Sequence, residues 1–524
     1  MLGLLQRATS NLKNPVNPTQ WDPSDDLASG FHRYSQVHAL PVSSLGSFAF
    51  AATGYYAKGT IRFRRAEPAL APEPSLEAPH HPPAYDDAAD SKLDIRHGQV
   101  HVSVEARTNS EGLYADSTLE PVQGHERCGI SLTTPASSSV GRIGASLSYH
   151  ITVTFPADFD SLDTVRVDAT SFRVQFDPSV AAVEFSNLDI STTDAPISFE
   201  CRSPGGEGEG GGLRAKSVKF RNENRLDPNK SSLKNFDDLI SGSIANADRI
   251  EIACENGPVS GTYRSSGPIV VSTTNFPIKG DFAAAGALRL STTNAEISGT
   301  FESKRDIMVQ NAHGKVEGTY KAPLGCNIKG AYMPITAAFE VGHELRLKTT
   351  VFRIDATIRI LPPVSAAAGG AAASSSGVAP VTRVESTVTT ETDELPTFAD
   401  AMKTTAPAAV TVVAETSDAG AELVYEQCPS DVVLRSLVRS TGGSVILVKH
   451  GETYEGAFAA TCPITHTASV SVPPGPTSHG TRSIRYDVEK RNHLAGVVGY
   501  EGNANTGRSR TVIESGGGAE FVFA

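Results

Sequence analysis

Apolar residues recur every 19 residues between residues 250 and 358. Each repeat opens with two apolar positions separated by one residue. These pairs are Ile250 and Ile252, Ile269 and Val271, Leu288 and Leu290, Ile307 and Val309, Cys326 and Ile328, and Leu345 and Leu347. Because residues two apart point to the same face of a β-strand, the pattern predicts one short strand at the start of every repeat.

A second strand follows in each repeat, with large, small and large residues at a spacing of two. The sets are Val259, Gly261 and Tyr263; Ile278, Gly280 and Phe282; Ile297, Gly299 and Phe301; Val316, Gly318 and Tyr320; Ile335, Ala337 and Phe339; and Ile354, Ala356 and Ile358. The small residue is expected to leave room beneath the aromatic ring. Polar residues between them, such as Lys279, Glu317 and Asp355, are predicted to face outward.

A fixed period without insertions is typical of a repeat fold in which each unit buries its apolar face against the next. The 46 glycines, 32 prolines and single tryptophan also fit a turn-rich β protein. The sequence thus predicts an all-β fold, a β-solenoid (β-helix) of 19-residue rungs with a preceding β-rich segment and disordered linkers.

One turn position carries asparagine in three repeats, at Asn256, Asn275 and Asn294, and His313 takes the same position in the next repeat. Asparagine tolerates left-handed turn geometry and bonds to neighbouring backbone groups. We therefore expect an asparagine ladder at a corner of the solenoid, with His313 as a turn residue and not a metal ligand.

The repeat reappears outside this block. Residues 188–197 match residues 288–297 almost position for position. Farther along the chain, residues 446–458 resemble residues 307–320 with one residue deleted, which aligns Ile446 with Ile307. The solenoid is therefore predicted to resume after a long low-complexity stretch.

Composition breaks divide the chain into seven segments. They are an N-terminal segment with short strands (1–66), a Pro-rich disordered linker (67–91), a β-rich entry part of the solenoid (92–202), a Gly-rich loop (203–213), the solenoid repeats (214–360), a low-complexity disordered insertion (361–424) and C-terminal strands that continue the solenoid (425–524). The linkers are rich in Pro, Ala, Ser and Thr and have no periodic apolar face.

The repeat unit reads apolar-x-apolar-(S/T)-T-x-N-x-x-(I/V)-x-G-x-(F/Y), and a stretch from Tyr149 to Pro156 precedes it. This combination resembles the adhesin families that include the auto-transporter adhesin head GIN domain, and it is similar to adhesin-like proteins of unknown function in fungi. The resemblance covers about residues 125–360 and 430–524. It implies a solenoid fold and an adhesin-like binding role.

The net charge of −12 is spread along the chain, which disfavours nucleic acid and anionic membranes as partners. No run of about 18 apolar residues predicts a membrane span, and the first seven residues have too short an apolar run for a signal peptide. A cytoplasmic location is therefore favoured. The six widely spaced cysteines predict buried thiols, with disulfides as the alternative.

The sequence carries no recognisable enzyme motif, so we expect no enzyme, no metal site and no cofactor. Outward positions of consecutive rungs change character, so carboxylates do not gather as a sugar-cleaving site requires. Threonines that recur in the repeat suggest a flat binding face, but β-propensity alone explains Thr273, Thr274, Thr292, Thr293, Thr349 and Thr350. The favoured function is a non-enzymatic, adhesin-like scaffold or binding protein. The alternatives are a self-assembling cytoskeletal polymer and a carbohydrate-active β-helix enzyme.

One short motif suggests a partner. Pro82, Pro83 and Tyr85 form the sequence PPxY, which WW domains bind as a polyproline II segment. A similar segment, residues 395–401, has Phe398 in place of the tyrosine.

A peptide spanning residues 76–92 should bind a WW domain with a dissociation constant of about 1–100 µM, because little ordering entropy is lost on binding. Tyr85→Ala should abolish the binding, and Tyr85→Phe should leave a weak remnant. Fluorescence polarisation against a panel of WW domains checks this. A binding curve that is the same for the parent and the Tyr85→Ala peptide contradicts the interpretation.

Overall fold

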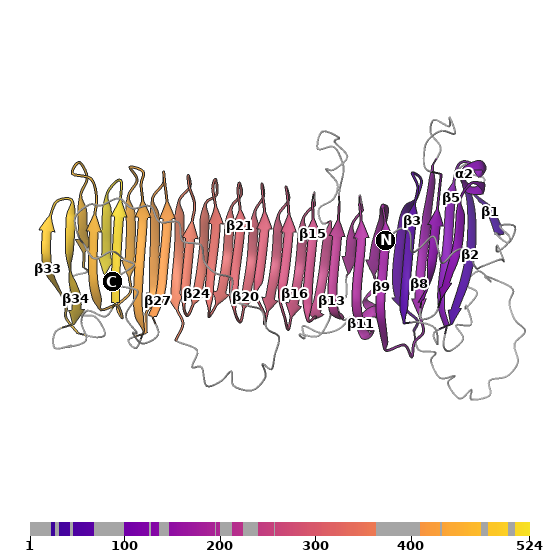
Figure 1. The fold of residues 1–524 in the computed structure, drawn as a ribbon, viewed down its shortest axis with the longest axis horizontal. Helices are drawn as coiled ribbons and strands as arrows, with labels where there is room; N and C mark the ends of the chain where they lie inside the picture. The colour runs from indigo at the N-terminus through magenta and orange to yellow at the C-terminus, as the bar shows by residue number, and fades with distance from the viewer. Residues whose placement is uncertain are drawn as a thin grey trace, which may run out of the picture. The chain divides into compact units, whose positions relative to one another are not determined.

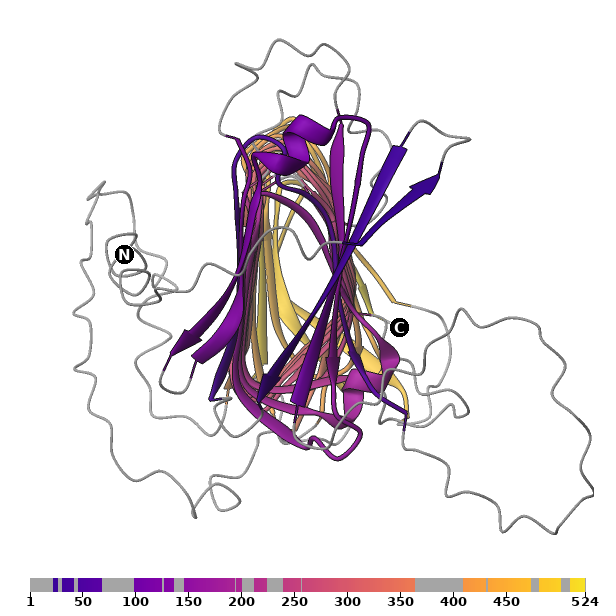
Figure 2. The same cartoon turned by 90° about the vertical axis from the view of Figure 1, so that its right-hand side faces the viewer.

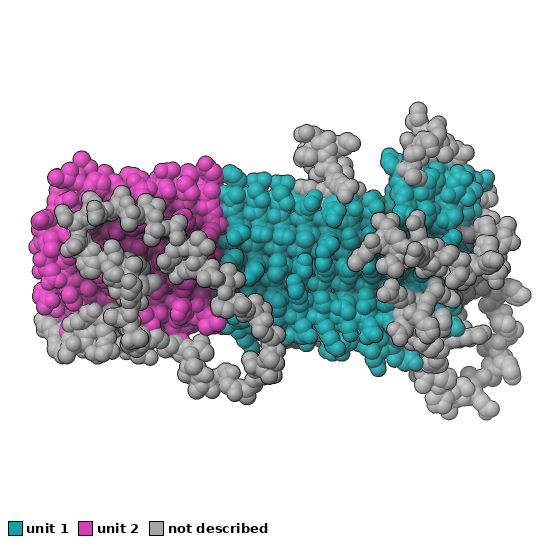
Figure 3. Space-filling model, in the orientation of Figure 1, with its two compact units in different colours: residues 1–318 teal, residues 319–524 magenta. Residues whose placement is uncertain are grey.

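The computed structural model describes residues 22–26, 31–41, 46–67, 99–124, 127–135, 146–193, 195–199, 212–223, 239–255, 257–362, 409–429, 432–472, 480–500 and 509–523. The chain divides into two compact units, residues 1–318 (unit 1) and residues 319–524 (unit 2), shown in Figure 3. Strands dominate the described ranges, which also contain the short helix α2 (Glu111–Ala115) and the 3-10 helix η4 (Pro178–Ala182).

Unit 1 consists of two facing sheets, which Figure 2 shows end-on. Sheet A contains, in spatial order, β6 (Thr118–Gly124), β7 (Arg127–Thr133), β3 (Ser47–Thr53), β9 (Ser161–Ala169), β11 (Glu184–Thr192), β13 (Leu213–Asn222), β15 (Arg249–Cys254), β17 (Ile269–Thr273), β19 (Leu288–Thr292) and β21 (Asp306–Asn311). Sheet B contains β1 (Asp22–Asp26), β2 (Phe31–Pro41), β5 (Gln99–Thr108), β8 (Leu147–Phe155), β4 (Lys58–Arg65), β10 (Ser171–Phe176), β12 (Ile197–Phe199), β14 (Ile240–Asn246), β16 (Val259–Ser265), β18 (Ile278–Ala284) and β20 (Ile297–Ser303). From β7 onward the chain of unit 1 alternates between the sheets, so one strand from each makes a rung (Figure 1).

Unit 2 has the same arrangement of two facing layers of strands, here called sheets C and D, and β22 (Val316–Ala322) crosses the boundary between the units in the sequence. Sheet C contains β23 (Gly325–Gly330), β25 (Glu344–Lys348), β27 (Ala409–Thr416), β29 (Val433–Ser440), β35 (Ser509–Ser515), β31 (Gly456–Thr461), β34 (His493–Tyr500) and β33 (Arg482–Lys490). Sheet D contains β24 (Ile335–Val341), β26 (Ile354–Ile360), β28 (Ala421–Gln427), β30 (Ile446–His450), β36 (Ala519–Phe523) and β32 (Ala468–Ser471).

The predicted β-solenoid with 19-residue rungs is confirmed by the strand register. In unit 1 the parallel strands align Ile250 with Ile269, Leu288 and Ile307 in sheet A, and Val259 with Ile278 and Ile297 in sheet B. In unit 2, Cys326 lies opposite Leu345 and Ile335 opposite Ile354. All of these side chains are buried, and they form the core between the sheets.

Aromatic rings stack along the same columns. In unit 1 the ring of Phe282 lies 4.9 Å from that of Tyr263 and 5.6 Å from that of Phe301, measured between centroids, and the planes are nearly parallel. Each such pair adds about 0.5–1.5 kcal/mol to the stability that burial provides.

The small residue in the second strand of the unit 1 repeats is required by the backbone conformation, and not only by the need for room beneath an aromatic ring. Gly261, Gly280 and Gly299 have φ values of 135°, 134° and 139°, a backbone conformation that favours glycine. A Cβ on Gly280 would lie 2.0 Å from the carbonyl oxygen of Gly261 on the neighbouring rung. In unit 2, Ala337 and Ala356 occupy this position and are buried.

The predicted asparagine ladder is present between two rungs, where Asn294 Nδ2 donates to Asn275 Oδ1 at 2.7 Å. Asn256 lies outside the described residues. Polar residues also pack inside this corner, because Thr273 Oγ1 donates to the Phe276 carbonyl at 2.6 Å and Asn311 Nδ2 to the Ala295 carbonyl at 2.8 Å. Thr273 and Thr292 are buried and cannot belong to a flat outer face, whereas Thr274 and Thr293 are exposed.

The N-terminal segment at residues 1–66 contributes strands to both sheets of unit 1. Strand β3 lies between β7 and β9 in sheet A, and β4 lies between β8 and β10 in sheet B, with parallel register on both sides. Two strands from this segment are therefore part of the solenoid core. At the next boundary, residue 213 belongs to β13 and not to the Gly-rich loop.

The predicted insertion at 361–424 ends too late. Residues 409–416 form β27, which aligns Val412 with Leu345, and residues 421–427 form β28, which aligns Ala421 with Ile354. Both strands are full members of the rungs because their alternate residues are buried. The predicted linker at 67–91 lies, apart from Glu67, outside the described residues.

The C-terminal strands continue the solenoid, but the predicted register of Ile446 is wrong. Ile446 aligns with Ala421 in sheet D, the sheet of the second strands, whereas Ile307 belongs to a first strand. The similarity of residues 446–458 to residues 307–320 therefore reflects a shared strand pattern and not an equivalent place in the rung.

Edge strands in both units carry features that prevent strand pairing with another chain. In unit 1, β1 contains Pro23 and β6 contains Pro121, each of which removes an amide donor from the edge. In unit 2, β32 has only four residues, and β33 has a register shift between Tyr486 and Val488. These features disfavour growth of a polymer through the described edges.

Ile297→Asp should destabilise unit 1 by about 3 kcal/mol or more, because it places a carboxylate in a column whose neighbours are fully buried. Ser298→Asp is the control, since Ser298 is on the outer face of the same strand and should change stability by less than about 0.5 kcal/mol. Urea unfolding followed by circular dichroism checks both. Equal stability of the two variants contradicts the register.

Replacing residues 365–405 with a Gly-Ser linker of half the length should change stability by less than about 1 kcal/mol, because loop entropy varies slowly with length. Replacing residues 365–420 instead removes β27 and should unfold the strands that pair with it, β25 and β29. Limited proteolysis of the two proteins distinguishes these outcomes. A loss of folded protein in the shorter replacement shows that residues 365–405 contribute to packing.

Candidate functional site

The structure does not describe the predicted partner motif. Pro82, Pro83 and Tyr85 lie outside the described residues, as does the similar segment at 395–401. The WW-domain interaction therefore stays a prediction. The candidate surface is instead built from residues that turn from sheet C to sheet D in unit 2.

Four exposed apolar residues lie on these turns, and together they form what we call the apolar corner. Tyr332 follows β23, Phe352 follows β25, Val445 follows β29 and Ile464 follows β31. Their exposed fractions are 51%, 44%, 57% and 80%. Tyr332 and Phe352 lie on the turns of adjacent rungs, whereas the turns after β27 and β35 separate Phe352 from Val445 and Val445 from Ile464. Exposed apolar side chains that gather on one part of a surface are typical of an interaction site, whereas single ones are common on any surface.

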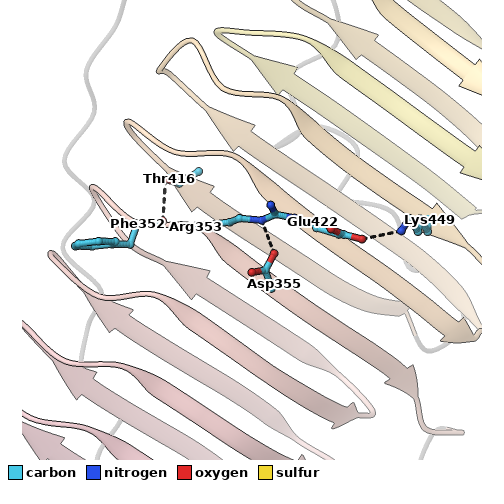
Figure 4. Close-up of polar contacts among 6 residues, drawn as sticks. All are labelled: Phe352, Arg353, Asp355, Thr416, Glu422 and Lys449. Carbon is cyan, nitrogen blue, oxygen red and sulfur yellow. Dashed lines mark hydrogen bonds and ion pairs between the residues drawn. The ribbon is translucent and has the colours of Figure 1, made fainter.

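A chain of ion pairs begins next to Phe352 (Figure 4). Arg353 Nε lies 2.5 Å from Asp355 Oδ1, and its Nη2 lies 2.5 Å from Glu422 Oε2 on the neighbouring strand. Glu422 Oε1 in turn lies 2.7 Å from Lys449 Nζ on the strand after that. These four residues, the ion-pair chain, connect β26, β28 and β30 across the outer face of sheet D.

The ion-pair chain fixes the turn that carries Phe352. Arg353 is the next residue, and Thr416 Oγ1 donates to the Phe352 carbonyl at 3.5 Å. Figure 4 shows the Phe352 ring pointing away from the strands, while Arg353 reaches across them toward Glu422. Because several ion pairs act together, they restrain the backbone of the turn from which the ring projects.

Glu422 in this network is a poor candidate for acid catalysis. The hydrogen bond from Lys449 lowers the pKa of Glu422, and the charge of Arg353 lowers it further. A general acid at neutral pH needs a raised pKa. The network therefore serves structure and recognition better than proton transfer.

Two cysteines and one histidine are other described groups that suggest chemistry. Cys128 and Cys326 are buried thiols whose pKa burial raises, to about 12 for Cys128, which makes them unreactive. His313 lies on the turn where the sequence placed it. Within the described ranges no three His, Cys, Asp or Glu residues gather as a metal site, and no helix there is long and apolar enough to cross a membrane.

No protein-family model matches the chain, and no curated protein matches it. A solved structure described as a "putative cell adhesion protein" from Clostridium sporogenes ATCC 15579 is similar over 96% of this chain and 99% of that chain. The identity is 7% and the TM-score 0.14, so the likeness carries no argument about function.

Sequence reasoning missed the apolar corner, although a signal was present. The turn position that holds Asn275 and Asn294 in earlier repeats holds Tyr332 in a later one. An apolar residue at a polar turn position indicates that the turn has a purpose beyond capping. The irregular turns at Val445 and Ile464 break the period, so no repeat alignment reveals them.

Proposed function

We propose that the protein is a non-enzymatic, adhesin-like binding scaffold that binds a protein partner through the apolar corner of unit 2. The exposed Phe352 ring, held beside the ion-pair chain, is the observation that carries the proposal. An aromatic residue on a fixed turn binds with little loss of conformational entropy, and aromatic anchors dominate the energetics of protein interfaces.

Charged residues beside the corner suit a protein interface. Arg353, Asp355, Glu422 and Lys449 are balanced in charge and already paired, so a partner does not have to neutralise them. Such residues form a polar rim around an apolar centre. The expected partner surface is therefore apolar with a mixed-charge border.

The two rival functions receive less support. A self-assembling polymer needs open strand edges, whereas Pro23, Pro121 and the irregular β33 obstruct pairing at the described edges. A carbohydrate-active enzyme needs a free acid and base, whereas Asp355 and Glu422 are engaged by cations.

The adhesin-like part of the proposal rests on the repeat consensus that resembles the GIN-domain families. The proposal includes a cytoplasmic location. It also includes a second contact, separate from the apolar corner, in which a WW domain binds Pro82, Pro83 and Tyr85. Buried thiols such as Cys128, Cys326 and Cys462 suit a reducing compartment.

Phe352→Ser should weaken partner binding about thirtyfold, since loss of an aromatic anchor costs about 2 kcal/mol. The full chain is crosslinked in extracts of the cells that express it, and each recovered protein is then titrated singly against parent and variant by biolayer interferometry. Thermal unfolding should show little change, because Phe352 is 44% exposed.

Leu324→Ser is the matched control. Leu324 is 49% exposed in the same unit but lies on the turn between β22 and β23, which runs toward sheet C and so belongs to the other corner. Its loss should leave the affinity unchanged. Equal affinity of parent and Phe352→Ser, or equal weakening by both variants, contradicts the proposal.

A further inference from the structure

His450 occupies an unusual place in unit 2, because it is fully buried at the end of β30. Its ring stacks on Tyr425 at 4.8 Å and on Tyr454 at 3.9 Å, with Phe523 at 5.6 Å, between centroids. Neither ring nitrogen has a hydrogen-bond partner among the described residues. A buried polar group without a partner is costly, so the position favours an apolar ring unless the imidazole has a role.

The hairpin of β33 and β34 holds the turn that covers this histidine. Arg482 Nη2 donates to the carbonyls of Gly451 at 3.1 Å, Glu452 at 3.2 Å and Tyr454 at 2.7 Å. The Tyr500 hydroxyl, opposite Arg482 in the hairpin, donates to the same Glu452 carbonyl at 2.6 Å. Release of the hairpin therefore frees the turn whose Tyr454 ring rests on the imidazole.

We propose that His450 and Arg482 form an acid-sensitive latch, in which protonation of His450 favours the opened state of the β33–β34 hairpin. A second positive charge beside the Arg482 guanidinium, in a site without an acceptor, cannot be accommodated while the hairpin is closed. Opening also exposes the edge of β31, which pairs with β34 in the closed state.

Tyr425, Tyr454 and Arg482 surround His450, and none of these three groups changes its charge in acid. Burial raises the pKa of Tyr425 on β28 and of Tyr454 in the turn, so both stay neutral in acid. Burial lowers the pKa of Arg482 on β33, which still remains a cation in acid, while the Glu452 and Glu455 carboxylates act on Arg482. Strand β36 contributes only Phe521 and Phe523.

The direction of the pH effect follows from the two protonation states. Burial and then the Arg482 charge lower the pKa of His450 from 6.5 to about 3 in the closed form. The closed form is therefore fully favoured above pH 6.5 and loses its advantage as the pH falls toward 3, since only the open form binds the proton. Uptake of one proton raises the opening constant about tenfold per pH unit in this window.

Hydrogen exchange of the full chain between pH 7 and 4.5, corrected for intrinsic rates, measures this opening constant in peptides that cover residues 482–500. The parent should show no slope near pH 7 and approach the tenfold slope as the pH falls below 6.5. His450→Phe keeps the ring but cannot take up the proton, so it should lose that slope. His343→Gln removes an exposed imidazole from the same unit and should behave as the parent does.

A flat pH dependence in the parent overturns the latch, and so do parallel slopes for the parent and His450→Phe. His450→Leu takes the same role if the phenylalanine variant does not fold. The measurement needs no partner and does not involve Phe352. Failure of the latch is therefore distinct from failure of the proposed binding function.

Discussion

The parallel register of the rungs is the constraint on which the rest of the structure depends. Each inward residue lies directly opposite its counterpart on the next rung, so the apolar columns stay continuous only if every strand keeps its phase. A slip by one residue would turn a whole strand inside out. The register decides which strands pair, and strands that are distant in the sequence can be neighbours in a sheet. Strand β3 lies between β7 and β9, and β27 aligns Val412 with Leu345 across a long stretch of sequence. A segment joins the fold wherever its alternation matches the column, whatever its position in the chain.

This dependence on register explains how much could be predicted. Between residues 250 and 358 the period itself gives the register, because equivalent residues are 19 apart and the pairing partner is the next repeat. Strands β3 and β4 alternate just as well, but their partners are distant in sequence, and alternation alone does not reveal the partner. The sequence does not predict β27, because the strand lies in a segment of biased composition, although its residues Val410, Val412 and Ala414 alternate inward. The error at Ile446 is of the same kind, since the two strands of a rung have similar patterns and differ in the turns around them.

The candidate site was less predictable than the fold for a related reason. Core positions are repeated, so the sequence states each of them several times, whereas Phe352 or Ile464 occurs once. Exposure of these residues depends on how their turns are held, and at Phe352 that depends on Arg353 reaching Glu422 on the next strand. The residues of the ion-pair chain come from both sides of the low-complexity segment, at residues 353–355 and 422–449. The strand register therefore brings the residues of the candidate site together, and no local sequence motif contains them.

The covered sheet edge of unit 2 and the buried His450 depend on the same hairpin, β33–β34. A solenoid must end in strands that resist further pairing, and in unit 2 the β33–β34 hairpin covers β31 for that purpose. The simplest stable design would place a phenylalanine at position 450, since Phe521 and Phe523 already line the same site. An imidazole there sacrifices stability, and the lost stability becomes dependent on pH because the proton can enter only when the hairpin opens. Departures from local rules tend to concentrate at functional sites. Here the departure is His450, which lies beneath the turn that Arg482 and Tyr500 hold by hydrogen bonds, beside the pairing of β34 with β31 that covers the sheet edge.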